Sequence, residues 1–521
     1  MKKLLALLLL IFFTDACGKL RLPAIISNGM VLQLQMDVTI WGWAGQNDKI
    51  GIKTSWDNKT FETYTDKKGK WQVKIKTPST GGPYTMSISN GSEQIELENI
   101  LIGEVWLCSG QSNMQWSLKA SSNSEEEVKN SNYSQIRFFN VAHNTSDVPC
   151  EDAIGKWEIC ISHTASKFSA IGYFFGREIH KEARVPVGLI NNSWGGTPAQ
   201  SWIKKEILLS DDDYKYYLEI DQQANENKEK NLKEYDERLV RWQEEVNNAK
   251  ASGKKSPAQP SMPGSLRPQN RCYVLYNSMI YPLMPYAIKG VIWYQGESNA
   301  GDAYLYRKLF PAMIDNWRAD WGQGDFPFYF VQLSNFYNNL VENRPDELPK
   351  VNPADGSAWA ELREAQTMAL SLPNTGMAVT MDIGDPYNIH PTNKMDVGKR
   401  LALLALAKDY GFKDITYSGP LYKNMKIENN KIRLYFDYAS SGLIAKDGQL
   451  KGFTIAGENK GFVWANAQID DDTIVVWSEE IKEPKAVRYA WANWIECNLF
   501  NKHDLPASPF RTDDWQCITK K

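Results

Sequence analysis

Hydrophobic and polar residues alternate in short runs over residues 20–100, with turn sequences between the runs. In one run Trp71, Val73 and Ile75 recur with a period of two, and glycine-containing turns occur at 28–29, 68–69, 81–83 and 90–91. No segment of this region has the three- and four-residue spacing of an amphipathic helix. The pattern therefore predicts a small antiparallel β-domain over residues 19–100.

A different rhythm begins near residue 101, where apolar strand-like runs alternate with helical patterns. The runs read LIGEVWL, IRFFNV, PVGLINN, GVIWYQ, FPFYFVQL and GMAVTM, and the helical patterns lie around 167–184, 301–320, 359–371 and 394–411. Such alternation predicts an α/β domain over 101–414, with a parallel sheet covered by helices on both faces. After residue 415 the short alternating runs return, and they predict a C-terminal β-domain over 415–521.

Residues 204–255 interrupt the α/β pattern with a segment rich in Glu, Lys, Asn and Gln. Its apolar residues recur at three- and four-residue spacing, as Leu232, Tyr235, Leu239, Trp242 and Val246. This stripe of apolar residues predicts one or two long inserted helices. A proline-rich linker at 255–270 follows them. A helix docked on its own domain is the simpler interpretation, and a lid or a dimer contact is the alternative.

The N-terminus has the pattern of an export signal. Lys2 and Lys3 precede a ten-residue apolar run, Leu4 to Phe13, which is too short to span a bilayer. We expect residues 1–18 to be a signal peptide and the protein to be periplasmic or extracellular. Cys17 follows Ala16 and suggests lipid attachment as an alternative. No later segment has 18 uninterrupted apolar residues, so no transmembrane helix is expected in the mature chain.

Charge and cysteine content narrow the possible partners. The net charge of −3 argues against nucleic acid or an anionic membrane surface as a general partner. Seven cysteines in an exported chain allow disulfides, and the pairs 150/160 and 497/517 are close in sequence. No CxxC motif or Cys/His cluster predicts a metal site. The sequence does not indicate an oligomeric state.

Two polar segments that follow predicted strands carry candidate hydrolytic chemistry. The run LIGEVWL ends on CSGQSNM, which places Ser112 where a strand gives way to a helix. A serine nucleophile needs a base, and of the five histidines only His390 follows the last strand of the α/β region, in MDIGDPYNIHPTNK. Carboxyl ends of parallel strands share one edge of the sheet, so Ser112 and His390 are predicted to meet there. An ordinary loop histidine is the alternative interpretation.

Two further segments offer donors for an oxyanion. NNSWGGTPAQSW follows the strand PVGLI, and its Gly195 and Gly196 allow backbone amides to approach a ligand. WYQGESN follows GVIWY and contributes the side chains of Gln295, Glu297 and Asn299. Each segment alone is equally consistent with a polar turn, and GESNA offers Ser298 as a second candidate nucleophile.

In combination and in this order, the blocks GQSNM, NNSWGGTPAQSW, WYQGESN and NIHP resemble the sialate O-acetylesterase family of SGNH-type hydrolases. The resemblance extends from RLPAIISNGMVLQ near residue 21 to NLFNKHDLPASPFRTD near 513 and excludes the 204–255 insertion. It implies a three-layer α/β/α SGNH-hydrolase-like domain with flanking antiparallel β-domains. It also implies removal of O-acetyl groups from sialic acid without a metal or organic cofactor.

The resemblance also implies roles for particular residues. Ser112 is expected as nucleophile and His390 as base, with an oxyanion hole formed by Ser112, Gly195, Gly196 and Gln295. Gln295 replaces the asparagine that SGNH hydrolases usually have in this block. The usual aspartate three residues before the histidine is Tyr387 here. Asp385 is the favoured third member, and Asp382 or a Ser–His dyad are the alternatives.

The sugar-binding residues and the substrate are less defined by the sequence. Trp116, Trp194 and Asn299 are expected to contact the sugar, because they lie beside the motifs, although the tryptophans equally suit core packing. Acetylated xylan or another hemicellulose is the alternative substrate. A non-catalytic glycan-binding protein is the alternative from a different functional class.

Overall fold

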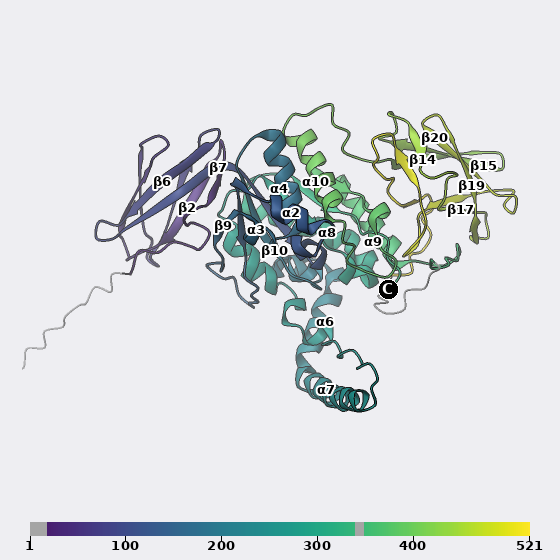
Figure 1. Ribbon diagram of the computed structural model, residues 1–521, viewed down its shortest axis with the longest axis horizontal. Coiled ribbons are helices and arrows are strands. Elements are labelled where there is room, and N and C mark those ends of the chain that lie inside the picture. The colour runs from purple at the N-terminus through teal and green to yellow at the C-terminus, as the bar shows by residue number, and fades with distance from the viewer. Residues whose placement is uncertain (1–17, 339–347, 521) are drawn as a thin grey trace, which may run out of the picture.

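The computed structural model describes residues 18–338 and 348–520, and it arranges them in three parts side by side (Figure 1). A β-domain, a central α/β domain and a second β-domain follow one another, and a helical arm projects from the central part. The predicted α/β fold with flanking antiparallel β-domains is confirmed. The predicted signal sequence and Cys17 lie outside the described residues, except for Gly18.

The central sheet has the strand order β13-β12-β11-β7-β10-β8-β9. All neighbouring strands are parallel except β8 and β9, which pair antiparallel at one edge. The strands are β7 (Gln94–Gly110), β8 (Tyr133–Asn140), β9 (Trp157–Cys160), β10 (Val187–Ser193), β11 (Gly290–Tyr294), β12 (Phe328–Val331) and β13 (Thr375–Ala378). Strands β11, β12 and β13 are buried throughout, as expected for a sheet that is covered on both faces.

Helices cover both faces of this sheet and form a three-layer domain (Figure 1). On one face α4 and α10 pack together, and Phe175 of α4 contacts Trp106 of β7 with ring centroids 4.9 Å apart. On the other face α8 packs beside α9, and Trp317 of α8 meets Trp293 of β11 at 5.7 Å. The helices of this domain are α1 (Ser112–Gln115), α2 (Ser124–Asn130), α3 (Ser162–Ala165), α4 (Ala170–Ala183), α8 (Ala303–Trp321), α9 (Ala358–Met368) and α10 (Lys394–Asp409).

The N-terminal β-domain is joined to the central sheet by a shared strand. The 17-residue strand β7 pairs with β6 in its first half and with β10 and β11 in its second half. The predicted domain boundary at 100/101 therefore falls inside a continuous strand. The other strands of this domain are β1 (Val31–Gln33), β2 (Asp37–Trp43), β3 (Lys49–Thr54), β4 (Thr60–Tyr64), β5 (Lys70–Lys76) and β6 (Gly81–Ser89).

The C-terminal β-domain contains three small antiparallel sheets. Its strands are β14 (Leu421–Glu428), β15 (Lys431–Asp437), β16 (Leu443–Ala445), β17 (Phe453–Ala456), β18 (Phe462–Trp464), β19 (Asn466–Asp470), β20 (Thr473–Trp477), β21 (Ala486–Tyr489), β22 (Leu499–Asn501) and β23 (Phe510–Arg511). The fully buried Arg363 of α9 donates to the carbonyl oxygens of Ala492 (2.7 Å) and Asn493 (3.1 Å), which fixes this domain to the central one.

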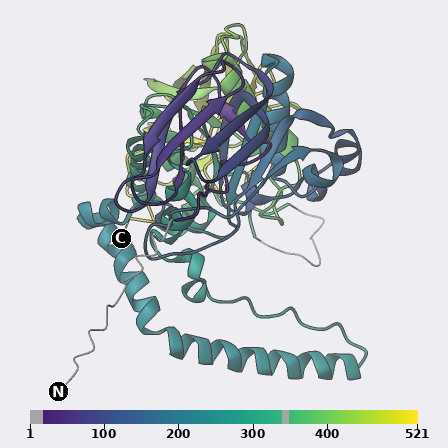
Figure 2. The ribbon, with the colours of Figure 1, turned by 90° about the vertical axis from the view of Figure 1, so that its left-hand side faces the viewer.

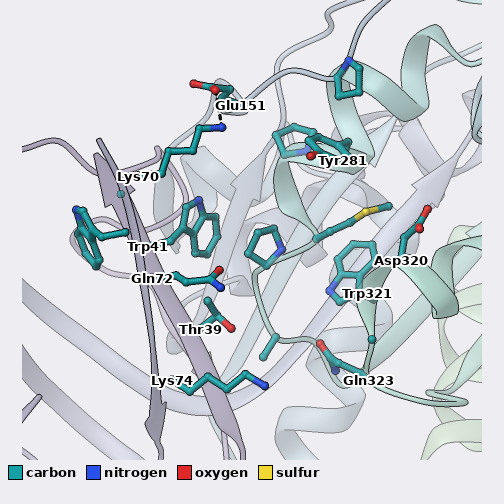
Figure 3. Close-up of a pocket in the computed structure, with 18 of the residues that line it drawn as sticks. Thr39, Trp41, Lys70, Gln72, Lys74, Glu151, Tyr281, Asp320, Trp321 and Gln323 are labelled. Atoms are coloured by element: carbon teal, nitrogen blue, oxygen red, sulfur yellow. Dashed lines mark ion pairs between the residues drawn. The ribbon is translucent and has the colours of Figure 1, made fainter. Parts of the chain in front are cut away.

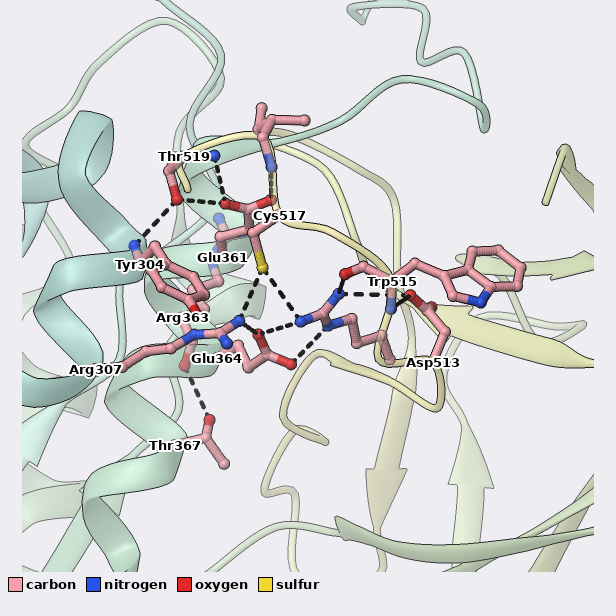
Figure 4. A network of polar contacts seen from close by, with 12 residues as sticks. Tyr304, Arg307, Glu361, Arg363, Glu364, Thr367, Asp513, Trp515, Cys517 and Thr519 are labelled. Atoms are coloured by element: carbon pink, nitrogen blue, oxygen red, sulfur yellow. Dashed lines mark hydrogen bonds and ion pairs between the residues drawn. The ribbon is translucent and has the colours of Figure 1, made fainter. Parts of the chain in front are cut away.

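The last residues of the chain return to the central domain and bind to α9 (Figure 4). The buried Glu361 carboxylate accepts hydrogen bonds from the amides of Ile518 (2.7 Å) and Thr519 (3.1 Å). Glu364, one turn later, pairs with Arg307 of α8 and with Arg511. This network links α8, α9 and the C-terminal segment.

The insertion divides into a part that belongs to the core and an arm that leaves it (Figure 2). Its helices are α5 (Lys205–Ser210), α6 (Lys215–Glu226) and α7 (Lys228–Ala251). Leu208, Tyr214 and Tyr217 are buried in the main core, so the first part of the predicted 204–255 insertion packs on the central domain. On α7 the predicted stripe of apolar residues packs on the proline-rich linker that follows the helix. There Tyr235 and Trp242 donate to the carbonyl oxygens of Pro260 and Pro257.

The six described cysteines are all free thiols, so neither suggested pair, 150/160 nor 497/517, forms a disulfide. Within residues 18–338 and 348–520, no helix combines the length and apolar character needed to cross a bilayer.

Candidate active site

Ser112 lies at the carboxyl edge of the central sheet, directly after β7. Gly110 ends this strand with φ of 132°, and a Cβ at this position would lie 2.2 Å from the Tyr294 carbonyl oxygen of β11. Only glycine fits such a close approach of two backbones. The next amide, of Gln111, donates to the same carbonyl oxygen (2.9 Å), and α1 then begins at Ser112. The half-buried serine therefore projects from a rigid strand-to-helix turn.

His390 reaches Ser112 from one end of the strand order, while Ser112 follows the central strand. It follows the edge strand β13, three strands away from β7, which corresponds to roughly 14 Å across the sheet. The loop after β13 returns over the carboxyl edge and brings His390 Nε2 to 2.9 Å from Ser112 Oγ. The imidazole stacks on Trp116, with ring centroids 5.0 Å apart and an interplanar angle of 20°. The His390 amide donates to Asn388 Oδ1 (2.9 Å).

A buried polar network lies beside this pair and joins the segments that carry Ser112 and His390. The side-chain nitrogen of Asn113, Nδ2, donates to the carbonyl oxygen of Ile389 (3.0 Å) and to Glu297 Oε1 (2.6 Å). Lys394, buried in the first turn of α10, donates through Nζ to Asn113 Oδ1 (2.5 Å). Asn113 therefore connects the neighbours of the serine and of the histidine to an ammonium and a carboxylate.

Burial shifts the protonation equilibria of all three ionisable groups here. Desolvation, assisted by the positive charge of Lys394, lowers the pKa of His390. Desolvation also lowers the pKa of Lys394 to about 7, although Glu297 opposes this effect. The pKa of Glu297 is raised by burial, and its Oε2 accepts no hydrogen bond from any described residue. A histidine with a lowered pKa is neutral near pH 7, as a general base requires.

Backbone amides for an oxyanion are present next to Ser112. The Ser112 amide lies in the first turn of α1, where helix geometry provides no intrahelical acceptor. Gly195 lies against the serine, because a Cβ built on it would be 3.2 Å from Ser112 Cβ. The Gly195 amide donates to Gln115 Oε1 (2.8 Å). A Cβ on Gly196 would lie 3.3 Å from Arg267 Nη1, which places a guanidinium beside this loop.

Gln295 and Asn299 are both completely buried, and their expected roles as oxyanion donor and sugar contact stay predictions. Gln295 Nε2 donates to Asn299 Oδ1 (2.7 Å) and to the Thr197 carbonyl oxygen (3.3 Å), and its Oε1 accepts from Tyr306. Asn299 also accepts from the Ala199 amide. In this arrangement the two side-chain amides therefore support the 195–200 loop.

Neither candidate aspartate hydrogen-bonds the imidazole within the described part of the chain. Asp382 forms a two-pronged ion pair with Arg400, at 2.7 and 2.6 Å. Asp385 Oδ1 accepts from the Tyr387 amide (2.9 Å) and thereby stabilises the turn before His390. Asp385 as the third catalytic member stays a prediction.

Trp116 and Trp194 are half-buried and flank the serine with two aromatic stacks. Trp194 stacks on His143 at 4.1 Å and 5°, and His143 Nε2 lies 3.3 Å from the Gln115 amide nitrogen. Ser298, the alternative nucleophile, has no histidine within hydrogen-bond distance among the described residues. Across residues 18–338 and 348–520 no three His, Cys, Asp or Glu side chains gather as metal ligands.

Four residues of this site were not identified from the sequence as parts of it, namely Asn113, Gln115, His143 and Lys394. Asn113 and Gln115 lie within the first motif, so their position was a usable signal. Lys394 lies four residues after His390 but resembles an ordinary polar residue at a helix start. His143 follows the predicted strand IRFFNV, so its place at the carboxyl edge was also a usable signal, and the parallel pairing of β8 and β10 brings it near the serine.

A serine hydroxyl bonded to an imidazole at the carboxyl edge of a parallel sheet is the arrangement of hydrolases with a serine nucleophile. The model of the family "Carbohydrate esterase, sialic acid-specific acetylesterase" matches residues 102–250 and 267–407, and the chain belongs to this family of esterases.

Similar proteins cover nearly the whole chain. The human sialate O-acetylesterase is 29% identical over 94% of this chain and 92% of its own length. The sialate O-acetylesterase of Rattus norvegicus is 30% identical, with 94% of both chains covered. The crystal structure of a carbohydrate acetylesterase from Xanthomonas citri is 35% identical and superposes with a TM-score of 0.79, covering 95% of this chain and 100% of that one.

Proposed function

We propose that this protein removes O-acetyl groups from a carbohydrate through an acyl-enzyme. The contact between Ser112 Oγ and His390 Nε2, at 2.9 Å, carries the proposal. His390 takes the serine proton while Oγ attacks the acetyl carbonyl carbon. The tetrahedral intermediate collapses, and His390 returns the proton to the departing sugar oxygen. His390 then takes a proton from water as the water attacks the acetyl-serine, and acetate leaves when Ser112 recovers its proton.

The amides of Ser112 and Gly195 are proposed to stabilise the oxyanion. Gly195 N–H points at Gln115 Oε1, so Gln115 must release this amide when the negative charge develops. The Gly195 N–H then exchanges a neutral amide oxygen for an anionic oxygen as its acceptor. Its hydrogen bond is therefore stronger in the transition state than before it. Gln115 thus holds the Gly195 loop in place and separates from it during the reaction.

The orientation of His390 is proposed to depend on Trp116 and on the loop backbone, with Asp385 as the candidate carboxylate. Asp385→Asn and Asp382→Asn variants should be compared by their pH–rate profiles with an aryl acetate. A carboxylate that holds the imidazolium is worth orders of magnitude in kcat. If neither variant loses more than about tenfold, roughly 1.4 kcal/mol, the Ser–His dyad is the working unit.

Sialic acid is the proposed source of the acetyl group, and acetylated xylan is the alternative. The names of the matched family and of the mammalian relatives favour sialic acid. Its carboxylate needs a cationic partner, and Arg267 lies beside Gly196 without an ion-pair partner among the described residues. Arg267→Ala should lower kcat/KM for an O-acetylated sialoside by about tenfold or more, because a charge-assisted bond is lost. Hydrolysis of acetylated xylan and of an aryl acetate should be unaffected.

The deciding experiment measures acetate release from O-acetylated sialosides, acetylated xylan and 4-nitrophenyl acetate, with Ser112→Ala as the inactive control. Release that depends on Ser112 supports the esterase, and the preferred substrate identifies the sugar. A well-folded protein that binds these glycans but releases no acetate would instead be the non-catalytic glycan-binding protein. Export is a further part of the proposal and rests on the apolar run from Leu4 to Phe13.

A further inference from the structure

A cleft separates the N-terminal β-domain from the central domain (Figure 3). Its volume is about 1210 Å³. Most small-molecule sites have roughly 300–1,000 Å³, so this cleft has room for an extended ligand. One wall is the outer face of the two-stranded sheet β2–β5, and the other is formed by residues 281–287 and 320–323.

The sheet wall combines largely buried aromatic side chains with more exposed hydrogen-bonding ones. Trp41 of β2 stands opposite Gln72 of β5, and Thr39 stands opposite Lys74. Opposed residues of paired strands project to the same face, so all four point into the cleft. Gln72 and Lys74 are exposed, and neither side chain forms a hydrogen bond or ion pair with another described residue.

The facing wall is largely aromatic and apolar. Tyr281 is 44% exposed and stands beside Trp321 on this wall (Figure 3), which Pro285 also lines. The buried Tyr286 underlies this wall, accepts a bond from Trp321 Nε1 at its carbonyl oxygen (2.9 Å) and meets Trp41 edge-on at 6.5 Å.

The two walls are held at a fixed separation. Tyr286 Oη donates to the Val31 carbonyl oxygen of the N-terminal domain (2.6 Å), and β7 runs without a break through both domains. A rigid cleft loses little conformational freedom when a ligand binds.

The charges of the cleft largely compensate one another. Lys70 pairs with Glu151 at 2.6 Å, and Lys204 pairs with Asp320 at 3.2 Å. This balance favours an uncharged ligand over a phosphate or a nucleic acid. Aromatic side chains beside uncommitted amide, hydroxyl and ammonium groups suit a ligand with apolar faces and many hydroxyls, which is the chemistry of pyranose sugars.

We propose that this cleft is a second glycan site, which binds neutral sugar units of the substrate chain without taking part in the chemistry. This second site rests on the proposed function, because the carbohydrate substrate supplies its ligand. Residues 284–287 precede β11 and residues 321–323 precede β12, so the cleft lies at the amino edge of the sheet. Ser112 lies at the carboxyl edge, about 17 Å away along a five-residue strand. Attachment there raises the local concentration of acetylated units near the active site.

Affinity electrophoresis tests the proposal with probes that carry no acetyl group, namely deacetylated xylan, hydroxyethylcellulose and desialylated mucin. The wild-type protein should be retarded by at least one probe. Tyr281→Ala and Gln72→Ala should weaken that binding, by about tenfold for the lost ring and about threefold for the lost hydrogen bond. Both side chains are exposed, so the variants are expected to fold.

Trp464→Ala is the matched control, because Trp464 is 46% exposed on β18 of the distant C-terminal domain. It should be retarded as strongly as the wild type. No retardation of the wild type, equal retardation of the cleft variants, or an equal loss in Trp464→Ala would each overturn the cleft site.

Hydrolysis of 4-nitrophenyl acetate by the same preparations separates this proposal from the proposed function. The cleft variants should hydrolyse it at the wild-type rate. Cleft-dependent binding without esterase activity would leave the cleft site in place and reject the esterase. Esterase activity without cleft-dependent binding would reject the cleft site alone.

Discussion

The substitution Lys394→Met tests whether the buried ammonium sets the working pH of His390. It replaces a charged side chain with an apolar one of similar length inside the network of Asn113 and Glu297. The positive charge of Lys394 contributes to the lowered pKa of His390, so its removal should raise that pKa. His390 accepts a proton only when it is neutral. The acidic limb of the pH–rate profile should therefore move to higher pH.

The size of the shift follows from the geometry around Trp116. Lys394 Nζ lies 5.7 Å from the centre of the Trp116 ring, and the centre of the His390 ring lies 5.0 Å from it. The ammonium and the imidazole are therefore no further apart than the sum of these two distances. At about 10 Å and an effective dielectric constant of about 20, two charges interact by roughly 1.7 kcal/mol, about one pKa unit. The acidic limb lies below the pKa of Lys394, about 7, so the lysine is mostly charged there.

The assay is kcat/KM for 4-nitrophenyl acetate between pH 5 and 9. The ratio of variant to wild-type kcat/KM should be about tenfold lower on the acidic limb than at pH 8. Lys408→Met is the control, because Lys408 lies on the same helix, about 21 Å further along, and donates to the Thr375 carbonyl oxygen. A cooperatively folded Lys394→Met protein with an unshifted limb would refute the electrostatic reasoning. A uniform loss at every pH would assign Lys394 to positioning Asn113 alone.

Three further outcomes are expected. Ser112→Ala should lower aryl acetate turnover by about 10⁴ or more, and near-normal turnover would exclude Ser112 as nucleophile. Gly195→Ala adds a Cβ 3.2 Å from Ser112 Cβ and should lower kcat by about 10- to 100-fold. Gly301→Ala, which meets no atom within 4 Å, should not affect kcat, and an equal loss in both variants would contradict the argument. Replacement of 228–262 by a short linker should preserve aryl acetate hydrolysis, and an inactive protein that still melts cooperatively would show that the arm helps to form the site.

The meeting of Ser112 and His390 could be predicted because it depends on a general property of parallel sheets. Both residues follow uninterrupted apolar runs, which identify strands that are buried on both faces. The carboxyl ends of such strands share one edge, whatever the order of the strands. The strand order itself, which separates β13 from β7 by two strands, was not needed for the prediction.

The shared strand β7 could not be predicted, because its environment changes halfway along. Residues Gln94–Asn99 are mostly exposed, as in a strand with one face in solvent, while Ile100–Gly110 are completely buried. The sequence therefore changes from alternating to mostly apolar at the point where the strand enters the central domain. A change of environment within one strand gives the same pattern as a domain boundary between two strands.

The roles of Gln295 and Asn299 show a different limit. A polar side chain directly after a strand is equally able to face a ligand or to satisfy buried backbone groups. Here Tyr306 of α8 donates to Gln295 Oε1 at 3.0 Å and joins this side chain to a buried network. Since the packing of α8 on the sheet determines this contact, local sequence spacing carries no information about it.

The network around Asn113 explains how a base on a long loop is held for a nucleophile three strands away. Asn113 follows the serine directly, and its side chain binds the carbonyl oxygen of Ile389, the residue before the histidine. Movement of the His390 loop relative to α1 therefore breaks a buried hydrogen bond, which costs about 1–3 kcal/mol when a partner is left unsatisfied. Lys394 and Glu297 bind the two ends of the same amide, so it has one orientation only. The distance between Ser112 and His390 is thus fixed by their sequence neighbours, independently of which group accepts the second imidazole proton.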